Sequence, residues 1–346
     1  MRSIKKILLP TDFSECAEPA TALAIKLGQT FKAEVIILFV YNAPLYFGVL
    51  AEMYMVPVEV VERLRSEAER NIEQLRQRAA EVGVSASGLA MEGMARDRII
   101  EIAQSNDVDL IVMGTHGRTG LRHLVPGSTA EHVVRTAPCP VLTVRPKTTP
   151  ESDPALQISR QAPGIRRERS RDSARVGESS EDHKEAPMRS IRNILLPTDF
   201  SDTAEQATAL AIEMAQAFSA KLLLLYVYDV PVYLGPFDQA YTAPPEILEK
   251  VRHNAERALE NLRERASTAG VAVESFALPG LPRDVIVEVA QSRVADLIVM
   301  GTHGRTGFRH LLLGSVAERV VRMAPCPVMT VGVKVPSAKA PSARLK

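Results

Sequence analysis

The stretch VMGTHGRTGLRHLVPGS, residues 112–128, decides how this chain is organised, because it joins an apolar run to a segment rich in glycine. A nearly identical stretch, VMGTHGRTGFRHLLLGS, occupies residues 299–315. Glycine directly after an apolar run is typical of an abrupt exit from a sheet, where the backbone adopts conformations that other residues avoid. The chain therefore contains the same local structure twice.

The two stretches belong to a repeat that covers most of the sequence. Asp12 and Cys139 recur as Asp199 and Cys326, each 187 residues later, so the copies differ by no net insertion or deletion. Solenoid units repeat at roughly 20–50 residues, and a period this long indicates two whole domains instead. We predict one domain over residues 1–145 and a second over residues 188–333.

Residues 146–187 have a different composition from the two copies. They are rich in Pro, Ser, Arg and Glu and show no apolar periodicity. Such a segment buries too little apolar surface to offset the entropy of ordering, so we predict a flexible linker there and a disordered tail over residues 334–346. The arginines between 166 and 175 are a candidate patch for nucleic acid or a protein partner. Eight acidic residues in the linker match its eight basic ones, which argues against that interpretation.

The overall composition excludes several classes of protein. Lys and Arg number 42 against 41 Asp and Glu, so no net field would recruit nucleic acid or an anionic membrane. No apolar run approaches the roughly 20 residues of a membrane span. The three cysteines, Cys16, Cys139 and Cys326, form no even disulfide framework. These features favour a reduced, cytoplasmic protein, and we expect Cys139 and Cys326 to be packing residues.

Short apolar runs alternate with helical patterns in each copy. The expected strands of the first copy are Ile7–Leu9, Val35–Val40, a weaker one within 84–91, Leu110–Met113 and Val141–Val144. Helical apolar spacing lies between them, around residues 20–27, 60–79, 99–103 and 130–137. This alternation predicts an α/β fold in which each copy is a doubly wound, five-stranded parallel sheet. Functional sites in such sheets lie at the carboxyl ends of strands, beside the switch in strand order.

Two polar features follow strands of this predicted sheet. Asp12, in LLPTDFSE, can hold a ligand hydroxyl or amine, although its spacing to Glu15 also fits a capping box at a helix N-terminus. Gly127 and Ser128 directly precede an apolar-periodic helix, where free N–H groups and the helix dipole favour phosphate. A loop with an ordinary N-cap is the alternative interpretation. Neither GxxxxGK[ST] nor GxGxxG after a strand is present, which weakens the case for a P-loop hydrolase or a dinucleotide enzyme.

The glycine spacing resembles that of a known family. GxxG, nine residues and then G[ST] read Gly114 to Ser128 in the first copy and Gly301 to Ser315 in the second, and PTDFS ends the first strand of each. This combination resembles the universal stress protein family over nearly everything except the linker and the tail. The resemblance implies a five-stranded sandwich like that of the adenine-nucleotide alpha hydrolases, and ATP as ligand, possibly with Mg²⁺. The residues it assigns to ATP are Pro10, Thr11, Asp12, Val40, Met113, Gly114, Gly117, Gly127, Ser128, Pro197, Thr198, Asp199, Val227, Met300, Gly301, Gly304, Gly314 and Ser315.

One departure from the family pattern concerns the phosphate end of the site. Some members place a second hydroxyl two residues after the serine, where this chain has Ala130 and Ala317. Thr129 can compensate in the first copy, whereas Val316 cannot do so in the second, and the affinities of the two copies can differ accordingly. The resemblance also implies pairing through the last strands, 141–144 with 328–331, in an intramolecular pseudo-dimer. A further homodimer and an unidentified protein partner stay open.

Three functions compete on the sequence alone. The first is an ATP-binding stress-response protein without strong catalysis. The second is a slow ATPase or phosphotransferase that uses His116 and His303 with Mg²⁺. The third is a scaffold or chaperone-like module that binds no nucleotide. We assign no catalytic or metal residues, because His116, His123, His303 and His310 have no Cys or carboxylate at ligand spacing.

Overall fold

The computed structural model describes residues 3–41, 46–47, 53–54, 58–115, 127–145, 190–229, 232–234, 240–242, 245–304 and 313–332. The predicted linker and tail lie outside the described residues, as does most of the glycine-rich loop of each copy. Among the described residues, no helix is long and apolar enough to cross a membrane.

Each copy builds the predicted alternation of strands and helices. The elements of the first copy are β1 (Lys6–Pro10), α1 (Glu18–Phe31), β2 (Glu34–Tyr41), α2 (Val58–Glu81), β5 (Ala86–Glu92), α3 (Ala95–Ser105), β6 (Leu110–Gly114), α4 (Ser128–Thr136) and β7 (Val141–Val144). Those of the second are β8 (Asn193–Thr198), α6 (Asp202–Phe218), β9 (Lys221–Tyr228), α7 (Pro245–Thr268), β12 (Val273–Pro279), α8 (Pro282–Ser292), β13 (Leu297–Gly301), α9 (Ser315–Met323) and β14 (Val328–Val331). Short two-stranded pairs are β3 (Tyr46–Phe47) with β4 (Met53–Tyr54) and β10 (Val232–Leu234) with β11 (Ala240–Thr242).

The strand order confirms the doubly wound topology. The strands of the first copy lie in the order β7-β6-β1-β2-β5 and those of the second in the order β14-β13-β8-β9-β12, parallel within each copy. The chain winds outward from β1 in one direction and then, from β6, in the other. The switch in strand order therefore lies between β1 and β6, and between β8 and β13.

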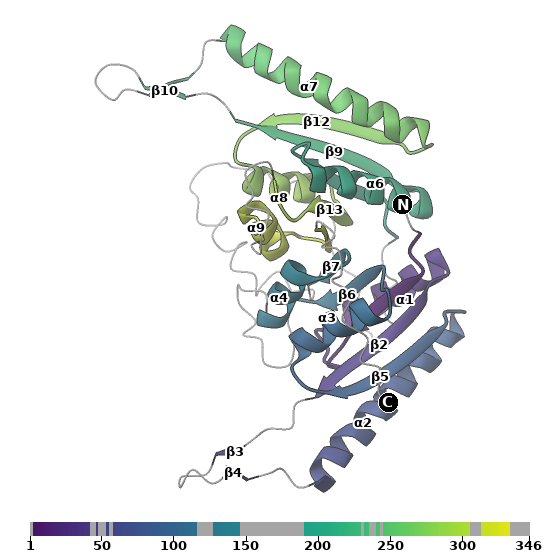
Figure 1. Cartoon of the computed structure of the whole chain (residues 1–346). Coiled ribbons are helices and arrows are strands. Elements are labelled where there is room, and N and C mark those ends of the chain that lie inside the picture. Colours follow the sequence, from purple (N-terminus) through teal and green to yellow (C-terminus); the bar gives the residue numbers. More distant parts are fainter. Residues whose placement is uncertain are drawn as a thin grey trace, which may run out of the picture. The chain divides into compact units, whose positions relative to one another are not determined.

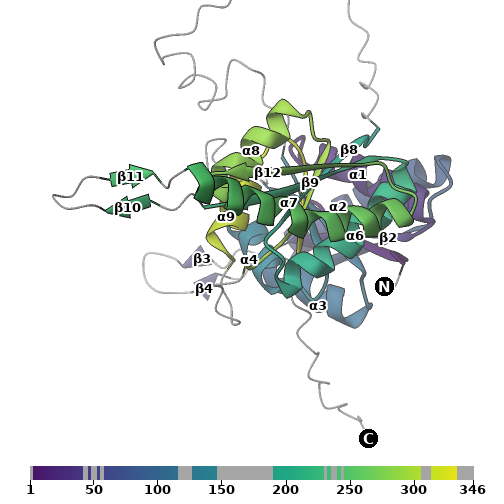
Figure 2. The ribbon, with the colours of Figure 1, turned by 90° about the horizontal axis from the view of Figure 1, so that it is seen from above.

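The helices cover both faces of the sheet because successive strand residues point to opposite sides. Ile7 and Leu9 pack in a cluster with α1 and α2, whereas Leu8 packs in another with α3 and α4. Figure 1 shows α2 alongside β5 and α7 alongside β12, and Figure 2 shows α6 and α7 along the strands of the second copy. The buried strand residues explain why these segments read as continuous apolar runs.

The two sheets are joined into one of ten strands. The last strands pair antiparallel, as predicted, with Leu142 opposite Met329. On the face that carries α1 and α6, a single apolar cluster contains residues of both copies. The Phe31 and Phe218 rings meet edge to face there, with 6.2 Å between their centroids. The pseudo-dimer is therefore formed within one chain.

The capping-box interpretation of Asp12 and Glu15 is wrong. Helix α1 begins only at Glu18, with Ala17 as N-cap and Pro19 in the first turn. Proline has no N–H and cannot donate to a carbonyl four residues earlier, so a helix that began at Glu15 would lack that bond. The second copy has Gln206 in place of Pro19, and its helix α6 begins three positions earlier, at Asp202.

Candidate functional site

The predicted site residues gather at the carboxyl ends of the strands that flank each switch in strand order. In the first copy, Pro10 ends β1 and Gly114 ends β6, with Thr11 and Asp12 directly after β1. The second copy repeats this arrangement, with Thr198 at the end of β8, Asp199 next to it and Gly301 at the end of β13. Ligands of doubly wound sheets bind in the crevice at this position.

The segment after the first strand forms the same polar turn in both copies. The Asp12 carboxylate accepts hydrogen bonds from the Ser14 N–H at 3.1 Å and the Ser14 hydroxyl at 2.6 Å. Asp199 accepts the same pair from Ser201 at the same distances. These bonds fix the orientation of each carboxylate before any ligand arrives.

A strained phenylalanine lies inside each of these turns. Phe13 has φ 58° and Phe200 has φ 61°, the left-handed region that costs a non-glycine residue roughly 1–2 kcal/mol. The Phe13 ring stacks on the Phe39 ring with 5.1 Å between their centroids, and the Phe200 ring packs on the Tyr226 ring with 5.0 Å between theirs. The packing of the ring offsets the strain of the backbone. Strain of this kind, repeated in both copies, is typical of a functional turn.

Glycine is required at two positions of the second copy, where β13 and the loop after it contact the polar turn. A Cβ at Gly301 would lie 2.7 Å from the Thr203 hydroxyl oxygen, and one at Gly304 would lie 2.6 Å from Asp199 Oδ2. Neither distance is compatible with a real side chain. The backbone of the loop therefore runs directly over the aspartate carboxylate.

The far end of the glycine-rich loop returns to its beginning and starts a helix. The Gly127 N–H donates to the Thr115 carbonyl at 2.8 Å, and the Gly314 N–H donates to the Thr302 carbonyl at 2.9 Å. Ser128 and Ser315 then open α4 and α9 and are exposed. Exposed N–H groups and a hydroxyl at a helix N-terminus, at the edge of the switch crevice, fit a phosphate group.

Apolar residues of the predicted site share one face of the sheet. Val40 packs against the cluster that contains Met113, on the side of α3 and α4. Val227 and Met300 do the same in the second copy, on the side of α8 and α9. An apolar surface beside a polar turn is the combination that a ligand with an apolar ring and a charged end requires.

Part of the predicted site cannot be placed. Gly117, like His116 and the arginines at 118 and 122, lies outside the described residues. His303 is described: its Nδ1 lies 2.9 Å from the Thr302 hydroxyl oxygen, and its Nε2 is buried without a hydrogen-bond partner among the described residues. Buried polar atoms normally have a partner, so this nitrogen is a place where a ligand or water fits.

Neither a reactive thiol nor a metal centre is evident in the described part of the chain. Burial raises the pKa of the Cys326 thiol to about 12, so the thiolate is not populated at neutral pH. Cys326 and Cys139 pack against the apolar clusters, as expected. No group of three His, Cys, Asp or Glu side chains that could hold a metal ion occurs among the described residues.

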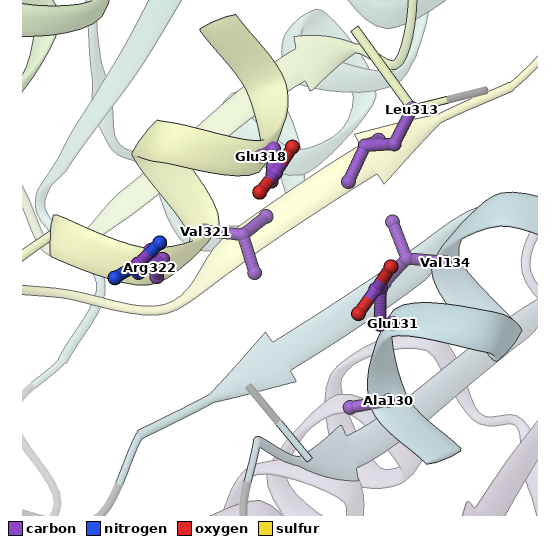
Figure 3. Close-up of a pocket in the computed structure, with 7 residues that line it drawn as sticks. All are labelled: Ala130, Glu131, Val134, Leu313, Glu318, Val321 and Arg322. Carbon is purple, nitrogen blue, oxygen red and sulfur yellow. The ribbon is translucent and has the colours of Figure 1, made fainter. Parts of the chain in front are cut away.

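A small pocket lies elsewhere, between α4 and α9 (Figure 3). Its lining residues are Ala130, Glu131, Val134, Leu313, Glu318, Val321 and Arg322. None of them is among the residues that the sequence assigns to nucleotide. A second, more polar pocket between α8 and α9 is lined in part by Ser315 and therefore adjoins the predicted phosphate position.

The sequence did not reveal every residue that shapes the site. The PTDFS motif indicates no role for its phenylalanine and serine, and the sequence alone does not mark Thr203 as part of the site. The duplicated PTDFS segment was the available signal, because Asp followed two residues later by Ser suits a side-chain-to-backbone turn. The left-handed phenylalanine had no signal, since glycine or asparagine is the usual residue there.

Comparison with known proteins agrees with this geometry. The sequence model of the universal stress protein family matches residues 3–145 and 190–332. The chain belongs to the universal stress protein family. It is a tandem member, since each copy matches the family separately.

Individual universal stress proteins show the same relationship. One from Methanocaldococcus jannaschii is 40% identical over 141 residues, which cover 40% of this chain and 81% of the relative. One from Thermus aquaticus is 40% identical over 143 residues, covering 41% and 98%. The crystal structure of a universal stress protein from Archaeoglobus fulgidus superposes on 95% of this chain and 97% of its own, with a TM-score of 0.62 and 18% identity. That likeness shows that the two-domain fold is shared.

Proposed function

We propose that this universal stress protein binds adenine nucleotide, ATP above all, at one site in each copy and acts through nucleotide-dependent contacts without strong catalysis. The observation that carries the proposal is the meeting of three features at the switch in strand order of the second copy. These are an oriented aspartate, a close-running glycine backbone and a serine at a helix N-terminus, and the first copy repeats the aspartate turn and the serine. The family resemblance stated from the sequence supports ATP as the nucleotide.

Each part of the site suits one part of such a ligand. Asp12 and Asp199 would accept from the ribose or the base, and Val40 with Met113, or Val227 with Met300, would flank the adenine ring. Gly127 and Ser128, and Gly314 and Ser315, would bind the phosphates through N–H and hydroxyl groups. Mg²⁺ would accompany the phosphates as their counterion. The cysteine usage favours the cytoplasm as the place of action.

The test is calorimetric titration of the full chain with Mg-ATP. We expect two sites per chain, one lost in Asp12→Ala and the other in Asp199→Ala, with the thermal unfolding temperature little changed. Val82→Ala, an exposed position just before β5 and so at the amino ends of the strands, is the control. Unchanged affinity in both aspartate variants would refute the assigned sites. Steady multiple turnover of ATP that disappears in the double variant His116→Ala, His303→Ala would instead support the ATPase alternative.

A further inference from the structure

The two copies differ at one hydroxyl beside the proposed nucleotide site. Thr203, the second residue of α6, is 4% exposed and donates to the His303 carbonyl at 2.5 Å. The corresponding residue of the first copy is Cys16. A thiol is a much weaker hydrogen-bond donor than a hydroxyl. The second copy therefore has a hydroxyl donor at a position where the first copy has only a weak one.

The hydroxyl protons of Ser201 and Thr203 show which of the two residues donates to the His303 carbonyl. Ser201 also lies near the His303 carbonyl, at 3.4 Å, but its single hydroxyl proton points to Asp199 at 2.6 Å. The Ser201 oxygen in turn accepts from the Ala204 N–H at 3.3 Å. The Thr203 hydroxyl is left as the donor that holds His303.

The position of His303 makes this bond relevant to the ligand. Gly304, the next residue, runs so close to Asp199 that a Cβ would meet its Oδ2 at 2.6 Å. The chain of bonds from Asp199 through Ser201 and the first turn of α6 to His303 thus fixes the loop and the carboxylate together. A site that is already ordered loses less entropy when its ligand binds.

We infer that Thr203 is a positioning residue that raises the nucleotide affinity of the second site. The inference rests on the proposed function, because it concerns the affinity of the same sites. It is independent of the difference between Thr129 and Val316, which concerns the phosphates directly. Thr203 itself touches the protein backbone and not the ligand.

The experiment compares hydroxyl variants in the full chain, with the other site silenced. In an Asp12→Ala background, only the second site would bind Mg-ATP. We expect Thr203→Val to weaken that binding about 3- to 10-fold, the ordinary worth of one hydrogen bond, and Thr203→Ser to restore it. Thr208→Val is the matched control, because Thr208 is equally buried in α6 but donates to the Ala204 carbonyl within the helix.

A ligand-free measurement completes the test. Without nucleotide, backbone hydrogen exchange across residues 301–304 is expected to accelerate in Thr203→Val and not in Thr208→Val. If Thr203 served only the packing of α6, Thr203→Val and Thr208→Val would change the exchange rate of this segment equally.

The outcomes separate this inference from the proposed function. If the unmodified chain binds no adenine nucleotide, both are wrong. If it binds, but Thr203→Val has the affinity of the unmodified site, only the inference is wrong. Equal weakening by Thr203→Ser and Thr203→Val would assign the effect to packing of the methyl group and would also overturn it.

Discussion

Individual residues of this protein have a strained backbone beside the proposed ligand sites, and a charged residue lies at the interface between the two copies. Phe13 and Phe200 keep left-handed backbone angles because their rings pack on Phe39 and Tyr226. The strain, roughly 1–2 kcal/mol at each position, lies directly after the aspartate of each polar turn. The fold also sets the environment of Glu213, a glutamate at the interface between the two copies.

Glu213 predicts a pH-dependent contribution to stability. It lies in α6, and burial raises the pKa of its carboxyl above the ordinary value of 4.5, although a backbone hydrogen bond from Ile4 of the other copy opposes the shift. With the folded-state pKa raised, stability is full below the unfolded pKa and falls as pH rises through the folded pKa. Glu213→Gln keeps a hydrogen-bond acceptor and removes the ionisable carboxyl, so this decrease of stability with rising pH no longer occurs. We expect the free energy of unfolding of the variant at pH 7 to be higher by roughly a few tenths of 1 kcal/mol. The effect is small because the carboxyl is half-exposed and solvent screens its charge.

The measurement is denaturant unfolding of both proteins between pH 4 and pH 8. The difference in the free energy of unfolding should vanish near pH 4 and open as pH rises above the ordinary glutamate pKa. Glu249→Gln, an exposed position on α7, serves as the control. A difference that stays constant over this range, or one that favours the glutamate at pH 7, would contradict the assigned cause.

The sequence predicted the candidate site in outline. The ends of the strands were marked by Pro10 and Gly114, and the helix N-terminus by Ser128, because these residues interrupt apolar runs. What could not be predicted was the close approach of Gly304 to Asp199, which depends on how β13 and β8 lie beside each other. Contacts between segments about 100 residues apart leave no local pattern in a single sequence.

At the scale of elements, the copies differ most in their first helices. Helix α6 begins at Asp202 with Ser201 as N-cap, whereas α1 begins at Glu18. Pro19 explains the later start, since the missing N–H would otherwise be needed in the first full turn. Because the first turn of α6 also carries Thr203, which donates to the His303 carbonyl, the start of this helix and the position of the loop are coupled in the second copy.

Gln206→Pro is expected to make α6 resemble α1. The helix should begin three residues later and lose the bond from the Ala204 N–H to Ser201, which costs about 1 kcal/mol or more. Asp202→Pro is the matched control. Proline is tolerated at the first helical position, and the extended Ser201, with ψ 166°, already suits a following proline.

Chemical denaturation and hydrogen exchange of residues 200–206 would check this prediction. Destabilisation in Gln206→Pro with rapid exchange in this segment, and neither in Asp202→Pro, is the expected pair of results. Equal destabilisation by both prolines would show that the helix start is not set by the missing N–H.

Apolar periodicity predicted the elements well because strands covered on both faces and helices covered on one leave different patterns. The third strand of each copy was the weakest prediction, and β5 extends over Ala86–Glu92 where the sequence suggested 84–91. It is an edge strand with only half-buried residues, so its apolar signal is diluted. The capping-box prediction failed because Phe13, directly after Asp12, has a left-handed backbone that cannot begin a helix, and Phe200 has the same after Asp199, where no proline follows.

At the scale of the whole molecule, the pairing of β7 with β14 joins the copies around a pseudo-twofold axis. Thr143 donates to the Val328 carbonyl at 3.1 Å, and its counterpart Thr330 donates to the Val141 carbonyl at 3.2 Å. Both threonines are almost fully buried. The apolar cluster continues across this join, so the interface has a core of its own. We therefore expect that the join does not depend on the covalent connection between the copies.

Cutting that connection tests the independence of the join. A chain with a specific protease site inserted near residue 165 should, after cleavage, elute from a sizing column at the position of the intact 37.8 kDa protein. The double variant Thr143→Val, Thr330→Val keeps side-chain volume but loses both hydroxyl bonds, about 1 kcal/mol each, so its fragments should associate roughly 30-fold more weakly in a dilution series. Thr21→Val removes a buried hydroxyl bond within one copy and should leave association unchanged. Fragments of the unmodified protein that separate as soon as they are cut would mean that the connection, and not the strand pair, keeps the two nucleotide sites in one molecule.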